Sequence, residues 1–460
     1  MDGIRIAFIH TILGVSTFPK ELQSLSIKFF CLQVVVSGIY LSHSWISLYY
    51  LSVLDSFSAF SIIVAIGMLA GAILDIPLGI LTDRYGQRMA FCGALCCLMF
   101  YYLGLSMATL STQLFFLEIL VGIYSALISG SFISWFLNSW ETIAPKSSDF
   151  ELLFREIMGN ISFAKSIVVA IATSIGGILL QQFRILPQCL FLVQALIAAL
   201  GILLGLKFIS QPRKEKKSQK KEQNLSSTSR SPIILNYLGR HYLFIIPFFM
   251  AFSILSFTSV SFSTMVFSPL LYEIYSSSQT FNQNNIVIHF SALSLLFITL
   301  TFSLSNMIFA FFSRLSGKIT SFIKSAYKGI LVFYILDYPV VWMAYLLVLI
   351  LNFPSFIKLS LIIFIFFIKI IFSGLATSLH WQLYYQITSS EKRSSQESLY
   401  NTINLIISLI GFGVIGIIIE SSSFIGTFLF LFIMSSLGIL VLMIAKNPEN
   451  SAHLNHSNQG

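Results

Sequence analysis

Several ionisable side chains stand inside long apolar stretches of the sequence, where a charge is costly. Each of them needs a partner or a water-filled cavity, and each is therefore a candidate for binding a solute or a coupling ion. A buried carboxyl group can take up and release a proton because burial favours its neutral form, and histidine titrates near neutral pH. The candidates for coupling or substrate contact are Glu118, Lys165, Lys369, Asp337, His43 and His380.

Both acidic candidates have competing interpretations. Asp337 can neutralise Lys369 across a helix contact as a structural ion pair, or it can take part in coupling, and the sequence favours neither. For Glu118 we favour proton uptake over a buried pair with Lys165. A lone histidine in an apolar helix is more often packed than ligating, so the two histidines are the weaker candidates.

The composition requires that these residues be positioned by elements that cross a membrane. Apolar residues make up 56% of the 460 positions and charged residues 10%, whereas a soluble domain carries about 25% charged residues. The apolar residues form runs of about 20, the length that crosses a hydrocarbon core roughly 30 Å thick. We expect an all-α membrane protein in contact with the lipid bilayer, with twelve transmembrane helices at 27–50, 58–81, 89–110, 113–137, 156–180, 186–208, 241–265, 286–312, 327–350, 358–383, 399–419 and 424–445.

The expected helices form two groups of six on either side of a basic stretch. The apolar run from Ile4 to Phe18 is too short to span comfortably, so an interfacial helix is expected there. The expected units are a cytoplasmic N-terminal or interfacial segment at 1–26, a six-helix bundle at 27–209, a basic cytoplasmic linker at 210–240, a second six-helix bundle at 241–446, and a disordered cytoplasmic tail at 447–460.

The net charge of +9 owes much to the basic linker, and it indicates a cytoplasmic loop rather than a nucleic-acid partner. Most other basic residues between the expected helices fall on the same side of the bilayer, with Arg184 and Lys358 as exceptions. Both termini are therefore expected in the cytoplasm, in a multi-pass protein of the plasma membrane. The five cysteines lie in apolar runs without a CxxC pattern, so neither a metal nor a cofactor is expected.

The two halves of the chain resemble each other in detail. Ser129-Gly130 in the first half parallels Ser373-Gly374 in the second, and the stretch 79–82 parallels 317–320. These parallels indicate that a six-helix unit is duplicated. Such repeats typically place a substrate site between the halves near the membrane midplane.

The loop after the second expected helix carries a specific motif. It reads Gly79-Ile80-Leu81-Thr82-Asp83-Arg84-Tyr85-Gly86-Gln87-Arg88 and resembles the signature of the major facilitator superfamily between its second and third helices. A glycine at 79 permits close helix approach and one at 86 a tight turn. The resemblance implies a loop that braces the two halves and gates the cytoplasmic side, through Gly79, Asp83, Arg84, Gly86 and Arg88.

The resemblance covers nearly the whole chain and implies two pseudo-symmetric six-helix bundles, in a monomer that carries a small solute by alternating access. Helices 1, 4, 7 and 10 would surround the central cavity, which favours Glu118 and Lys369 as cavity residues and places Asp337 on a peripheral helix. Glu118 precedes Gly122 where drug antiporters of the family often carry an arginine. The motif Ser129-Gly130-Ser131, with Trp135 and the stretch 75–79, resembles a poorly characterised prokaryotic branch of the family. Drug efflux is therefore a less favoured interpretation of the function.

The favoured function is a secondary transporter coupled to protons, either an antiporter or a symporter. One alternative is a membrane-embedded enzyme, against which stands the absence of an H-E-x-x-H motif or a Walker-type loop in the sequence. The other alternative is a transporter-like receptor that binds a solute without moving it. The sequence does not decide between drug efflux and nutrient uptake.

Overall fold

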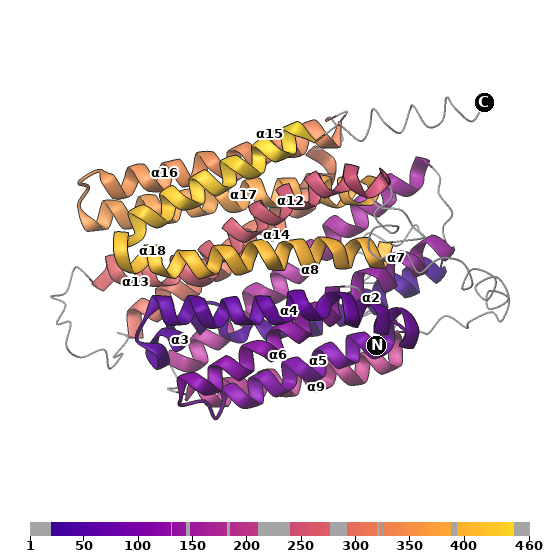
Figure 1. Cartoon of the computed structure of the whole chain (residues 1–460), viewed down its shortest axis with the longest axis horizontal. Helices are drawn as coiled ribbons and strands as arrows, with labels where there is room; N and C mark the ends of the chain where they lie inside the picture. The colour runs from indigo at the N-terminus through magenta and orange to yellow at the C-terminus, as the bar shows by residue number, and fades with distance from the viewer. Residues whose placement is uncertain are drawn as a thin grey trace, which may run out of the picture.

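The structure is a computed structural model that describes residues 20–129, 131–143, 148–181, 185–209, 240–276, 292–319, 323, 325–387 and 393–445. All regular structure in these residues is helical, and most helices run along the long axis of the molecule (Figure 1). The expected interfacial helix, the linker up to residue 239 and the C-terminal tail lie outside the described residues.

The first bundle contains the helices that precede the linker. They are α2 (Lys20–Gly38), the 3-10 helix η1 (Ile39–Ser42), α3 (Ile46–Leu54), α4 (Phe57–Tyr85), α5 (Gln87–Leu105), α6 (Ser111–Ser129), α7 (Phe132–Ile143), α8 (Ser148–Gln181) and α9 (Pro187–Phe208). α2 and η1 form the first span, which α3 continues, and α6 and α7 together form the fourth.

The second bundle contains the helices that follow the linker. They are α12 (Arg240–Ser261), the π-helix η2 (Phe262–Val266), α13 (Phe267–Ser276), α14 (Ala292–Ile319), α15 (Ala326–Asp337), α16 (Pro339–Ile350), α17 (Ser355–Ile387) and α18 (Arg393–Ile444). α12, η2 and α13 form the seventh span, and α15 and α16 form the ninth.

α18 accounts for the last two of the twelve crossings. Eleven helical segments among the described residues are long and apolar enough to cross a bilayer, and the last of them, Gln396–Ile444, has 49 residues. One crossing takes about 20 residues, and the backbone of this segment bends at Ser423, where φ is 61° and ψ is −172°. Figure 1 shows the two arms of α18 meeting at one end of the molecule. The predicted fold of two six-helix bundles is therefore confirmed.

The boundaries of α4 follow from its local sequence. Ser56 precedes the helix, and its hydroxyl accepts a 3.1 Å hydrogen bond from the amide of Ala59, which is a typical N-cap. The helix ends at Gly86, whose φ of 92° is open to glycine but strained for other residues. The amide of Gly86 donates to the carbonyl of Thr82 at 2.8 Å, which closes the last turn.

Four spans are interrupted along their length, and the break in the fourth span separates α6 from α7. The first changes from α-helix to 3-10 helix at Ile39, and the seventh contains the π-helix turn Phe262–Val266. The ninth is broken between Asp337 and Pro339, because proline has no amide hydrogen to continue the helix. Such interruptions leave backbone groups that need other partners and often mark functional sites.

The two bundles meet along two pairs of helices, α4 with α18 and α8 with α14. Glycines allow this approach: a Cβ atom at Gly79 would lie 2.9 Å from Ser398 Oγ, and one at Gly159 would lie 3.2 Å from the carbonyl oxygen of Ser313. Small residues are expected at such contacts because close packing drives association of helices inside a lipid bilayer.

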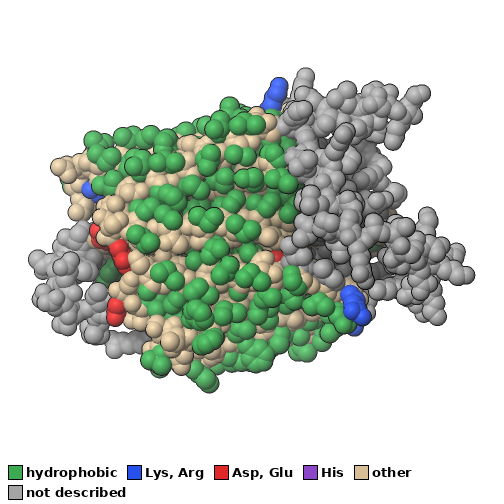
Figure 2. All heavy atoms as spheres, in the orientation of Figure 1, with side chains coloured by type: hydrophobic (Ala, Val, Ile, Leu, Met, Phe, Trp, Pro, Cys, Tyr) green, Lys and Arg blue, Asp and Glu red, His purple; other side chains and the backbone are tan. Residues whose placement is uncertain are grey.

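The outer surface and the two ends of the molecule differ in composition. Hydrophobic side chains cover the middle of the face seen in Figure 2, while charged side chains gather at the ends. Large hydrophobic side chains are exposed on the molecule, as Phe116 is at 67%. We call the end where α4 meets α5 the Gly86 end; its described basic residues include Lys20, Lys28, Arg84, Arg88, Lys207, Arg314 and Lys328. The opposite end, the Glu420 end, carries Asp55, Lys358 and Glu420. The chain is thus a multi-pass membrane protein.

Candidate functional site

A cavity of about 400 Å³ lies between the two bundles. The first bundle contributes α2, η1, α7 and α8 to its wall, and the second contributes α14 and α17. Polar groups on the wall come from Gln33, Tyr40, His43, Ser162, Lys165, Ser166, Ser305, Asn306 and Thr377, and aromatic rings from Phe29, Phe309 and Trp381. A cavity of this size and mixed lining matches ordinary small-molecule sites, which measure about 300–1,000 Å³.

Lys165 on α8 is exposed in this cavity. Its ammonium group has no hydrogen bond or ion pair with any other residue that the structure describes, and no described acidic residue lines the cavity. The pair of Glu118 with Lys165, weighed above as an alternative, does not form. The cavity therefore carries one positive charge that the described part of the protein does not neutralise.

His43 also lines the cavity, just beyond the 3-10 turn of the first span. Its ring centroid lies 5.4 Å from that of Tyr40 and 5.7 Å from that of Phe302 on α14, in edge-on contacts. The ring thus touches both bundles where they face each other.

Glu118 lies inside the first bundle and outside the cavity lining. The hydroxyl of Tyr50 on α3 donates to Oε1 of Glu118 at 2.5 Å, and the hydroxyls of Tyr50 and Tyr101 are 3.0 Å apart. The carboxyl group packs directly against α4, since a Cβ atom at Gly67 would lie 3.0 Å from Oε2. No basic side chain contacts Glu118 among the described residues, although its side chain is only 6% exposed.

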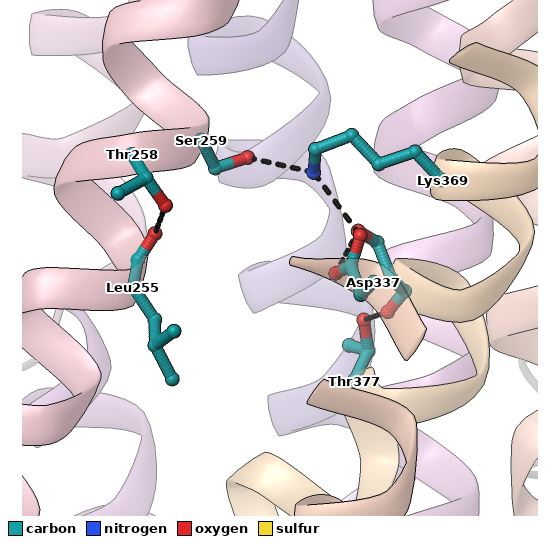
Figure 3. Close-up of polar contacts among 7 residues, drawn as sticks. Leu255, Thr258, Ser259, Asp337, Lys369 and Thr377 are labelled. Carbon is teal, nitrogen blue, oxygen red and sulfur yellow. Dashed lines mark hydrogen bonds and ion pairs between the residues drawn. The ribbon is translucent and has the colours of Figure 1, made fainter. Parts of the chain in front are cut away.

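Asp337 and Lys369 form a buried ion pair in the second bundle, with 3.2 Å between Lys369 Nζ and Asp337 Oδ1. The lysine also donates to the hydroxyl of Ser259 at 3.2 Å, and the hydroxyl of Ser373 donates to the other carboxylate oxygen at 2.6 Å. Figure 3 shows the lysine reaching from α17 between Ser259 and Asp337. Lys369 is thus held within its own bundle and does not line the cavity, contrary to what the family resemblance favours.

His380 is likewise enclosed by the second bundle. Its Nδ1 is 2.7 Å from the hydroxyl of Tyr334, and its ring lies 4.7 Å from that of Phe252. It is absent from the cavity lining, whereas the neighbouring Trp381 is part of it.

Comparisons with known proteins agree with this architecture. The sequence profile of the Major Facilitator Superfamily matches residues 29–381, which is more than half of the chain. The chain belongs to the Major Facilitator Superfamily. This facilitator is accordingly a secondary transporter and not an enzyme.

Two solved structures share the fold of this facilitator. A crystal structure of a mutant of the nucleoside transporter NupG aligns with a TM-score of 0.60 at 14% identity, over 92% of this chain and 100% of that one. A second crystal structure of NupG aligns with a TM-score of 0.58 at 13% identity, over 92% of this chain and 98% of that one. At such identities the likeness concerns the fold alone. No curated protein sequence matches the chain.

The residues of the expected gating loop lie at the Gly86 end of the facilitator. Gly79 touches Ser398 of the other bundle, and Gly86 makes the turn between α4 and α5. Arg84 is exposed, with its guanidinium carbon 5.7 Å from the centroid of the Tyr85 ring, and Arg88 is half-buried. The side chain of Asp83 lies outside the described part of the structure.

Three carboxylates outside the candidate site residues connect the bundles of this facilitator: Asp75, Glu420 and Glu397, whose Oε2 accepts a 2.5 Å hydrogen bond from the hydroxyl of Ser134 on α7. Asp75 on α4 accepts hydrogen bonds from Ser129 at 3.0 Å, from Asn401 at 3.1 Å and from Thr402 at 2.7 Å. The last two donors are on α18, in the other bundle. An acidic residue in an apolar helix is a visible signal for Asp75, but its two partners in the other bundle are more than 300 positions away and have no local signature.

Glu420 makes the corresponding contact at the opposite end. Its Oε1 accepts from the hydroxyl of Ser56 at 2.7 Å and from the amide of Ser58 at 3.0 Å, and its Oε2 accepts from the hydroxyl of Ser58 at 2.5 Å. A carboxylate from the second bundle thus caps the first turn of α4, where orphan amides and the helix dipole favour negative charge.

Proposed function

We propose that this facilitator couples the movement of a small solute to protons, that the cavity between the bundles binds the solute, and that Glu118 binds the proton. The observation that carries the proposal is the surroundings of Glu118: a buried carboxyl group that has a hydroxyl partner in Tyr50 and no cation among the described residues.

An isolated ionised carboxylate is costly in a low-dielectric interior. A proton bound to Glu118 removes that cost without any change in the fold. When water or a rearranged partner reaches the group, the ionised form becomes accessible and the proton can leave. A carboxyl group in such a site can therefore load and unload once in each transport cycle.

Asp337 is a weaker candidate for this role. Lys369 already neutralises it at 3.2 Å, and Ser373 donates to its second oxygen. A proton on Asp337 would leave the Lys369 ammonium buried without a counter-charge, which is unfavourable. We assign this pair to the stability of the second bundle.

Alternating access requires contacts between the bundles that can break at one end while they hold at the other. Polar contacts of this kind flank the cavity. Glu420 meets Ser56 and Ser58 on one side, and Asp75 meets Asn401 and Thr402 toward the Gly86 end. Rocking of the bundles would break one set and keep the other.

The test is transport into proteoliposomes with an imposed pH gradient. A panel of labelled nucleosides, sugars, amino acids and organic acids is supplied to the wild type, Glu118→Gln and Glu21→Gln, the last being the same change at an exposed position. We expect the gradient to drive accumulation in the wild type and Glu21→Gln, and Glu118→Gln to retain only downhill exchange. Accumulation by Glu118→Gln equal to that of the wild type would refute the assignment of Glu118.

We also propose that the Gly86 end faces the cytoplasm and that the protein resides in the plasma membrane with both termini inside. The basic residues of that end support this orientation through the positive-inside rule. In a cysteine-free background, an impermeant maleimide added to intact cells should label Lys358→Cys and should label Lys328→Cys only after permeabilisation. The reverse pattern would overturn the orientation.

A further inference from the structure

We propose that the solute is a small organic monoanion whose negative group pairs with Lys165. The proposal rests on the cavity being the solute site, as proposed above, and it adds the chemical class of the solute.

The first support is the charge of the cavity. Lys165 supplies the only permanent charge among the described residues of its lining. The buried carboxylates elsewhere in the described residues are engaged: Asp337 with Lys369, Asp75 with donors from three residues, Glu118 with Tyr50, and Glu397 with Ser134. Nothing described in the protein is left to neutralise the Lys165 ammonium. An unpaired cation in a confined, low-dielectric cavity attracts an anion more strongly than it would in bulk water.

The second support is the distribution of polar and apolar groups around the lysine. Ser162 and Ser166 stand close to Lys165 on the same helix, and Asn306 on α14 also lines the cavity. The side-chain amide of Asn306 donates one hydrogen to the carbonyl of Phe302 at 2.8 Å, which leaves a second amide hydrogen for a ligand. Hydroxyl and amide donors beside an ammonium group suit the oxygens of a carboxylate, sulfonate or phosphate ester.

The third support is the apolar part of the wall. The rings of Phe29, Phe309 and Trp381 line the same cavity. Such rings suit the hydrocarbon or aromatic portion of an organic acid and offer little to an inorganic anion, which is surrounded by water on all sides. A single lysine matches a single negative charge, so a dianion would bring one charge without a partner.

Ligand binding to the purified full-length protein tests the proposal directly. The probes are benzoate, 3-phenylpropionate, indole-3-acetate, benzenesulfonate and phenyl phosphate, and the neutral amides of the three carboxylates serve as controls. Binding is measured as thermal stabilisation over a concentration series. We expect at least one anion to stabilise the wild type and its neutral counterpart, where one is included, to bind at least about tenfold more weakly.

Variants separate recognition by Lys165 from other causes. Lys165→Met should weaken binding of the anion at least about tenfold, Lys165→Arg should retain most of it, and Lys328→Met, at an exposed position outside the cavity, should behave as the wild type. Preference for the amides, equal binding by Lys165→Met, or the lack of any binding across all five anions would overturn the proposal. Selective binding of the sulfonate would retain the monoanion class and identify the group. Selective binding of phenyl phosphate, which carries close to two negative charges at neutral pH, would contradict a monoanion.

The outcome is distinguishable from that of the proton-coupling test. The two proposals rest on different residues, because Lys165 lines the cavity and Glu118 does not. Anion binding without pH-driven accumulation in the wild type would remove proton coupling and keep the solute class. Accumulation of neutral solutes alone, driven by the pH gradient, would keep proton coupling and remove the anionic solute class.

Discussion

Lys369 and Asp337 meet at 3.2 Å at the level where the ninth span is interrupted. Pro339 begins the second segment of that span, and Tyr338 lies between the two helices. The rings of Tyr338 and Trp342 lie 5.0 Å and 5.6 Å from the lysine ammonium, so aromatic faces supplement the carboxylate. The broken helix and the ion pair thus form one structural unit.

Removal of one partner from this unit should destabilise the protein more than removal of both. Asp337→Asn leaves a buried ammonium without a counter-charge, at a cost of about 3–5 kcal/mol, and Lys369→Gln similarly strands the carboxylate. The double variant should recover part of the loss. Unfolding temperatures in detergent measure this cycle, and strictly additive losses would show that the two residues do not act as a pair.

Gly122 should tolerate no side chain. A Cβ atom there would overlap the backbone of Gly67 and lie 2.8 Å from the amide nitrogen of Gly71, so Gly122→Ala must push α6 away from α4. We expect a loss of about 1–3 kcal/mol, typical of overpacking. Gly413→Ala is the matched control, because nothing lies within 4 Å of a Cβ atom at that position. Equal unfolding temperatures for the two variants would contradict the close packing of α6 on α4.

Glu420→Gln should shift the facilitator toward the state that is open at the Glu420 end. The change weakens the hydrogen bonds to Ser56 and Ser58, and a loss of about 1 kcal/mol alters a conformational population about fivefold. The readout is the rate at which a maleimide supplied from that end labels His43→Cys in a cysteine-free background. Asp55→Asn removes a charge from an exposed position at the same end and should leave the rate unchanged.

Asp75→Ala should have the opposite effect. It removes the acceptor for Asn401 and Thr402, which connect α4 to α18 on the Gly86 side. Labelling of the same cysteine from the Gly86 end should rise, and labelling from the Glu420 end should fall. An increase from both ends would indicate general loosening of the bundles and not a shift between two states.

The sequence predicts the helices well because a long apolar run can adopt few structures other than a transmembrane helix. The expected helix 186–208 agrees with α9 (Pro187–Phe208), and the glycine predicted to make the turn at 86 does so with a positive φ. The break at Pro339 was not predicted, although proline is a visible signal, because hydropathy alone runs through it from 327 to 350.

The functional geometry is less accessible to sequence reasoning. The interior of each bundle and the surrounding lipid are both apolar, so periodicity does not reveal which face of a helix turns inward. Glu118 and Lys165 were both candidates, yet only Lys165 lines the cavity. The contacts of Asp75 and Glu420 join positions hundreds of residues apart, and a single sequence holds no record of such pairings.

If the cavity binds a monoanion through Lys165, as proposed, the charge of this lysine affects how the membrane voltage acts on the transport cycle. With a monoanion bound, the ammonium of Lys165 is neutralised and the loaded cavity carries no net charge across the electric field. Without the solute, the ammonium of Lys165 contributes one positive charge to the reorienting carrier, and movement of one charge across 100 mV is worth about 2.3 kcal/mol. The effect of voltage on the empty carrier then depends on the proton that we assign to Glu118. An interior-negative potential favours the inward-open state when Glu118 keeps its proton, and it has little effect when Glu118 is ionised and balances Lys165.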